Sequence, residues 1–168
     1  MADFDIYAPT LKKVEGGFVN NKKDPGGATM SGVTLSTYRK WYGADKTVRD
    51  LKAIPYNEWK AIMKGGYWDI AKCDEYVNQS VAEIVADWCV NSGVKVLKNV
   101  QKIVGVVQDG IIGPKSLAAI NSRDQKDLHQ KIFSARMKYY EDIVKKKPSQ
   151  AIFLRGWMNR LANFTYSE

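Results

Sequence analysis

The sequence predicts a mainly α-helical protein with at most a short β-hairpin near residues 17–34. Apolar residues recur at spacings of three and four along nearly the whole chain, which is the period of an amphipathic helix. Glycine and proline interrupt this pattern, as they do at helix ends. With 168 residues, 45% of them hydrophobic, the chain is long enough to bury a core of its own.

The first half of the chain predicts several short helices after the hairpin region. One carries Trp41 on its apolar face, and we expect Trp41 in the core. Thr47 and Asp50 match a capping box, in which each side chain accepts a hydrogen bond from the other residue's backbone N–H group. The following helix is expected to begin at a cap on Asn57 and to end at Gly65-Gly66, before a loop rich in aromatic residues.

The second half carries the strongest apolar stripe, which predicts a central buried helix ending at Gly93. Another helix should run to Gly105, and the next should begin at Pro114, because proline is favoured in the first helical turn. A long helix should stop at Pro148, and Ser149 should cap the last one. The stripe of the central helix consists of Val81, Ile84, Val85, Trp88 and Cys89.

Two carboxylates stand out in the N-terminal region. Glu15 is expected on the last turn of the first helix, because Gly16 and Gly17 follow directly and glycine favours the backbone that ends a helix. Its apolar neighbours disfavour a charge, which suits a general acid, whereas Asp24 lies in a turn that should be solvated and keep it ionised. Such an opposed pair is typical of glycoside hydrolysis, although a plain helix end and an ordinary turn explain any isolated pair more simply.

Four stretches, in order along nearly the whole chain, carry a more specific signal. They are Glu15-Gly16-Gly17-Phe18 with residues 20–34, and residues 85–93, 109–117 and 153–160. Together they resemble the glycoside hydrolase 108 family, lysozyme-like N-acetylmuramidases of phages and bacteria, with Phe18 and Val33 where the family usually has Tyr and Ile. The resemblance implies a lysozyme-like fold, a catalytic part at residues 1–93, and a helical peptidoglycan-binding-like part at residues 94–168 packed on it as one compact unit.

The resemblance also implies roles for individual residues. Glu15 would protonate the glycosidic oxygen, while Asp24 and Thr29 would hold the attacking water, as in the glutamate, aspartate and threonine cluster of inverting phage lysozymes. An ordinary turn explains Asp24 and Thr29 equally well.

Substrate-binding residues are expected in two places. The aromatic side chains of Tyr67 and Trp68, in the predicted loop, are candidates for stacking on sugar rings. Asn91 and Asp87, on the central helix, are candidates for hydrogen bonds to acetamido groups, although structural bonds at a helix end account for them equally well.

The formal net charge of +8 is concentrated in the second half of the chain. Residues 1–84 hold 12 basic and 11 acidic side chains, and residues 85–168 hold 14 and 7. A basic surface attracts polyanions such as nucleic acid or the anionic polymers of a bacterial wall. No nucleic-acid-binding motif accompanies the charge, so nucleic acid is not expected as a partner. The resemblance implies peptidoglycan as the partner instead.

Other hydrolytic chemistries find little support. His129 is the one histidine, so a zinc amidase or peptidase lacks a convincing ligand set, and no cofactor is indicated. A Cys/His peptidase would pair Cys73 or Cys89 with His129. We expect instead two buried free thiols and an exposed structural histidine.

The sequence predicts a soluble monomer without a membrane span or a cleavable signal peptide, made in the cytoplasm and acting on the wall after release or non-classical export. The activity that the resemblance implies is hydrolysis of the β-1,4 bond between N-acetylmuramic acid and N-acetylglucosamine. Two alternatives stay open. One is a lytic transglycosylase, and the other is a weakly catalytic wall-binding or secretion-accessory protein.

Overall fold

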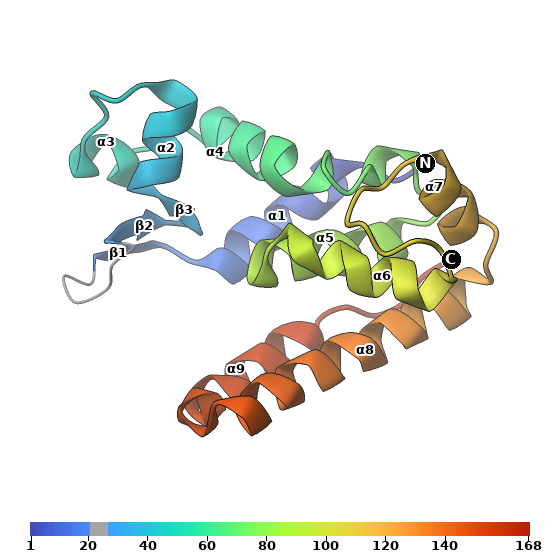
Figure 1. The fold of residues 1–168 in the computed structure, drawn as a ribbon. Coiled ribbons are helices and arrows are strands. Elements are labelled where there is room, and N and C mark those ends of the chain that lie inside the picture. The colour runs from blue at the N-terminus through green and yellow to red at the C-terminus, as the bar shows by residue number, and fades with distance from the viewer. Residues whose placement is uncertain (21–26) are drawn as a thin grey trace. The chain divides into compact units, whose positions relative to one another are not determined.

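Helices make up most of the structure, a computed structural model that describes residues 1–20 and 27–168 (Figure 1). They are α1 (Phe4–Glu15), α2 (Leu35–Tyr42), α3 (Val48–Lys52), α4 (Tyr56–Met63), α5 (Gln79–Ser92), α6 (Leu97–Val104), α7 (Pro114–Asn121), α8 (Gln125–Lys146) and α9 (Ala151–Leu161). A small antiparallel sheet contains β1 (Phe18–Asn20), β2 (Ala28–Met30) and β3 (Val33–Thr34). The predicted mainly α fold is confirmed, with one strand more than a hairpin needs. Within the described residues, no helix is both long and apolar enough to cross a membrane.

The chain forms two compact units. One consists of Asp5–Gly66 and contains nearly all of α1, the sheet, and α2 to α4. The other consists of Met1–Phe4 and Tyr67–Glu168 and contains α5 to α9. The division into a catalytic part at residues 1–93 and a wall-binding part at 94–168 is a functional one and stays a prediction.

In the unit Asp5–Gly66, local signals in the sequence position the sheet and the short helices. β2 is the middle strand, and Met30 pairs with both Phe18 and Val33. Thr34 ends β3 and caps α2, because its side chain accepts a hydrogen bond from the backbone N–H of Thr37. The predicted capping box of Thr47 and Asp50 is confirmed at the start of α3, which packs against β2.

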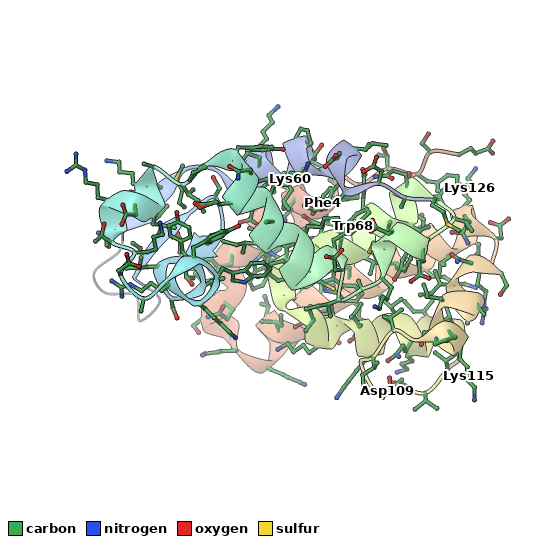
Figure 2. The ribbon with its side chains drawn as sticks, turned by 90° about the horizontal axis from the view of Figure 1, so that it is seen from above. Phe4, Lys60, Trp68, Asp109, Lys115 and Lys126 are labelled. Carbon is green, nitrogen blue, oxygen red and sulfur yellow. The ribbon has the colours of Figure 1, made fainter. Side chains whose placement is uncertain are left out.

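In the other unit, α5 is the central buried helix that the apolar stripe predicted. Val81, Ile84, Val85, Trp88 and Cys89 are all fully buried. α8 packs against α5, and α9 runs back along α8, as the orange and red helices of Figure 1 show. Figure 2 shows Phe4 beside Trp68, and their rings meet edge to face with centroids 5.4 Å apart.

Three predicted helix boundaries are wrong. α4 begins at Tyr56 after Pro55, whose fixed φ of −62° suits a helix start, so Asn57 lies inside the helix. The pair Gly65-Gly66 does not end the helix, because a π-helical turn, Lys64–Trp68, continues it. Ser149 lies in a 3₁₀ turn, and Gln150 precedes α9.

Candidate functional site

Glu15 is the last residue of α1, as predicted. Gly16 ends the helix with a φ of +71°, a left-handed conformation that glycine adopts without strain. The half-buried Glu15 carboxyl lies directly against Gly32, in the turn between β2 and β3. A Cβ atom at Gly32 would stand 2.7 Å from Glu15 Oε2, so no larger residue fits beside this carboxyl without displacing it.

The turn that contacts Glu15 consists of Ser31 and Gly32. Both have positive φ, +47° and +84°, and their neighbours Met30 and Val33 pair across the sheet, which is the arrangement of a type I′ hairpin turn. Ser31 is not glycine and is fully buried, so this conformation requires local support. That support comes from the end of α1, because Ser31 Oγ donates to the Gly16 carbonyl at 2.6 Å and Ser31 N donates to the Gly17 carbonyl at 3.2 Å.

Lys12 and Trp59 hold the other side of the turn. Lys12 Nζ donates to Ser31 Oγ at 3.0 Å and lies 4.9 Å from the centre of the Trp59 ring. Trp59 Nε1 donates to the Ser31 carbonyl at 2.9 Å. Burial lowers the pKa of Lys12. α1 and α4 together therefore fix the turn against which the Glu15 carboxyl rests.

Thr29 is one of the two residues predicted to hold the attacking water. It lies in the middle of β2, where it pairs with Val19 and Thr34. Side chains alternate along a strand, so Thr29 points away from the sheet face that buries Ala28 and Val33. Asp24 lies outside the described residues.

The aromatic residues near the site differ in how far their side chains are buried. The Trp41 side chain is 44% exposed and that of Tyr42 is 37% exposed, so the expectation of a core Trp41 is wrong. Tyr67 is half-buried and Trp68 fully buried, with Trp68 Nε1 donating to Asp74 Oδ1 at 2.6 Å. In this conformation Trp68 presents no surface to a ligand, and the sugar-stacking role of the Tyr67 and Trp68 pair stays a prediction.

Asp87 and Asn91 both form hydrogen bonds within the unit that contains α5. Asp87 is fully buried between two arginines, with Arg136 Nη2 at 2.6 Å and Arg160 Nη2 at 2.8 Å from its two carboxylate oxygens. Asn91 Oδ1 accepts a hydrogen bond of 2.6 Å from the Tyr140 hydroxyl. The buried Arg136 was not anticipated from the sequence, because arginine on a helix is normally exposed.

The residues of a possible Cys/His peptidase are buried. Cys73 and Cys89 are free thiols, as predicted, and both are fully buried. Burial raises the pKa of Cys73 well above its usual range and that of Cys89 to about 12. Because a thiolate is the nucleophile in such enzymes, these thiols are unsuited to that chemistry.

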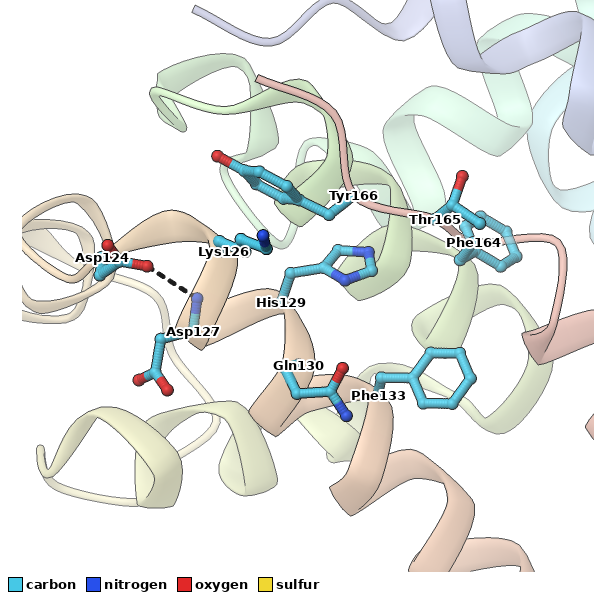
Figure 3. Close-up of a pocket in the computed structure, with 9 residues that line it drawn as sticks. All are labelled: Asp124, Lys126, Asp127, His129, Gln130, Phe133, Phe164, Thr165 and Tyr166. Carbon is cyan, nitrogen blue, oxygen red and sulfur yellow. Dashed lines mark hydrogen bonds between the residues drawn. The ribbon is translucent and has the colours of Figure 1, made fainter.

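The prediction of an exposed His129 is wrong, since only 4% of it is exposed. Figure 3 shows its ring between α8 and the C-terminal segment that carries Phe164 and Tyr166, and the Tyr166 ring packs on it edge to face at 5.9 Å. A cavity of about 530 Å³ opens beside these residues. Within the described residues, the buried Nε2 atom of His129 has no hydrogen-bond partner.

Burial lowers the pKa of His129 below its ordinary 6.5, which gives the stability a pH dependence. As the pH falls through 6.5, the unfolded chain binds a proton at His129 more readily than the folded protein does. The free energy of unfolding should therefore decrease as the pH falls from about 7 to 5. A His129→Phe variant should show a smaller decrease, and urea unfolding of both proteins at the two pH values measures it. An equal decrease in both would contradict the assignment to His129.

Two features of residues 94–168 are candidates for contacts with a ligand. Asp109 and Gly110 form a bend before α7, and Gly110 has the positive φ, +79°, that favours glycine. Gln101, which the sequence did not single out, is fully buried. Its side-chain oxygen accepts a hydrogen bond of 2.8 Å from Gly110 N and so stabilises this segment. A separate groove of about 450 Å³ on α6 and α8 is lined by Asn99, Lys102, Ile103, Ala135, Lys138, Tyr139 and Asp142.

Comparisons with known proteins fit both halves of the chain. Residues 8–93 match the model of the family described as glycosyl hydrolase 108, and residues 95–162 match a model described as a predicted peptidoglycan domain. A solved structure titled "Structure of Brucella abortus SagA" is similar over 96% of this chain and 90% of that chain, with a TM-score of 0.81 and 31% identity. No curated protein matches.

Proposed function

Because this chain belongs to the glycosyl hydrolase 108 family, we propose that it is a muramidase, cleaving the β-1,4 bond between N-acetylmuramic acid and N-acetylglucosamine. The family and the peptidoglycan domain together indicate a glycoside hydrolase that acts on peptidoglycan. The observation that carries the finer proposal is the Glu15 carboxyl, held against the hydrogen-bonded Ser31-Gly32 turn in the same unit as Thr29.

In the proposed mechanism, the Glu15 carboxyl gives its proton to the glycosidic oxygen as the bond from that oxygen to the anomeric carbon breaks. The leaving sugar departs with a free hydroxyl group. A water molecule held by Asp24 and Thr29 attacks the anomeric carbon from the opposite face and gives its proton to the Asp24 carboxylate. A fixed acid is useful here, because a general acid must lie within hydrogen-bond reach of the oxygen that it protonates.

The new reducing end tests which bond is cleaved. Purified peptidoglycan is digested with the protein, the products are reduced with borohydride, and the terminal sugar is identified by mass spectrometry. We expect reduced N-acetylmuramic acid. A 1,6-anhydro sugar would identify a lytic transglycosylase, and a wall suspension that keeps its turbidity would favour a wall-binding or secretion-accessory protein.

Asp24 allows a prediction about stereochemistry. If its carboxylate activates water, the water attacks from the face opposite the leaving group and the reaction inverts the anomeric centre. The two carboxyl groups must then be roughly 6.5–9.5 Å apart, so that the water molecule fits between them. Proton NMR of the first-formed reducing end should therefore show the α-anomer, and Asp24→Ala should lower turnover more than substrate binding. An initial β-anomer, or an Asp24→Ala enzyme of full activity, would remove Asp24 and Thr29 from the mechanism.

Residues 94–168 are proposed to hold the enzyme on the wall. This part of the chain matches a peptidoglycan domain and carries most of the net positive charge. The groove on α6 and α8 presents side chains suited to acidic glycans, namely the lysine Lys102, the amide of Asn99 and the aromatic ring of Tyr139, whereas Lys138 in the same groove is paired with Asp142.

A further inference from the structure

Trp41 is exposed in a protein that buries most of its tryptophan. Trp59, Trp68 and Trp88 are fully buried, and Trp157 is half-buried, whereas Trp41 is 44% exposed. Its indole N–H forms no hydrogen bond with the described residues. Leaving so much apolar ring in water is unfavourable unless something covers it.

The Trp41 ring is seated on the backbone of Gly65. A Cβ atom at Gly65 would come within 2.5 Å of Trp41 Cη2 and 3.2 Å of Cζ2, so no other residue fits at this position without moving the ring. The backbone of Gly65 is not left-handed, so its conformation does not require glycine. Glycine is required here because the Trp41 ring approaches the backbone so closely. At the next residue, Gly66, an added Cβ atom would have nothing within 4 Å of it.

The contact with Gly65 links the ring to the proposed acid through α4 and the Ser31-Gly32 turn. Gly65 follows Met63 by two positions, and Met63 Cε stands 2.9 Å from the point where a Cβ atom at Gly32 would be. Gly32 in turn lies against Glu15 Oε2. Gly65 belongs to the π-helical turn after α4, and such turns occur frequently at functional sites. All of these residues belong to the unit Asp5–Gly66, with Trp41 on α2 (Figure 1).

From this arrangement we infer that Trp41, seated on Gly65, is a platform for one N-acetylated sugar ring of the glycan strand. An indole suits this ligand because its face covers the apolar face of a pyranose ring, and its N–H group can donate to a hydroxyl or acetamido oxygen. The inference rests on the proposed function for the class of ligand. It concerns a different residue from the sugar-stacking role predicted for Tyr67 and Trp68. Trp41 is exposed, whereas Trp68 is fully buried.

The test measures binding without catalysis. A Glu15→Gln protein is titrated with chitotetraose, a soluble β-1,4-linked tetramer of N-acetylglucosamine, by calorimetry and by tryptophan emission. Adding Trp41→Ala should raise the Kd about tenfold and abolish the change in emission. Gly65→Ala should also raise the Kd, because the added methyl group displaces the ring, whereas Gly66→Ala should leave it unchanged.

The outcomes separate this inference from the proposed catalytic role of Glu15. Thermal unfolding of each variant shows whether it folds, and the two glycine variants test the platform without removing the ring. An unchanged Kd in Trp41→Ala, equal effects of Gly65→Ala and Gly66→Ala, or no binding of chitotetraose at millimolar concentration would each overturn the inference. None of these results bears on whether Glu15→Gln loses hydrolysis.

Discussion

Replacing Glu15 with glutamine is expected to slow peptidoglycan hydrolysis by about 10²–10⁴-fold. Glutamine has nearly the same volume and keeps a hydrogen-bonding oxygen, but it has no proton to give to the glycosidic oxygen. The fold should survive, because Glu15 is half-buried at a helix end and the Ser31-Gly32 turn is held by Lys12, Gly16, Gly17 and Trp59. Turbidity loss of a wall suspension measures the rate.

The matched control for this prediction is Glu141→Gln. Glu141 is exposed on α8, and its replacement makes the same chemical change away from the site. Both variants should give the circular dichroism spectrum of the original protein. A Glu15→Gln enzyme that lyses walls at the original rate would show that Glu15 is not the acid.

Local signals made much of the fold predictable from the sequence. Glycine at a helix end and a capping box act within a few residues, so Glu15 at the end of α1 and Thr47 before α3 were both predicted correctly. The glycine-rich stretch likewise marked the only part of the chain expected to form strands, and the described strands lie there.

Burial was less predictable where it depends on residues far away in the chain. A helical period identifies an apolar face but not the element that covers it. Trp41 is exposed although it lies on such a face, and His129 is buried because the C-terminal segment packs on a helix with a polar pattern. The support for Ser31 also comes from distant residues, since Lys12 and Trp59 lie 19 and 28 positions away.

Asp87 shows the same limit and leads to the second large effect. The sequence left it open whether this residue binds substrate or serves the structure, and its partners Arg136 and Arg160 lie 49 and 73 positions further along the chain. Both the carboxylate and the Arg136 guanidinium are fully buried. Removing one member of a buried ion pair leaves the other charge without compensation, which is more costly than the pair itself is stabilising.

Asp87→Ala is therefore expected to lower the free energy of unfolding by about 3–5 kcal/mol. Urea unfolding followed by tryptophan emission measures it. Asp142→Ala is the matched control, because it removes an aspartate from an exposed pair with Lys138 and should leave the stability unchanged. If Asp87→Ala were too unstable to purify, Asp87→Asn would keep the volume and test the charge alone. An Asp87→Ala protein of full stability that no longer hydrolyses peptidoglycan would instead support the substrate-binding role.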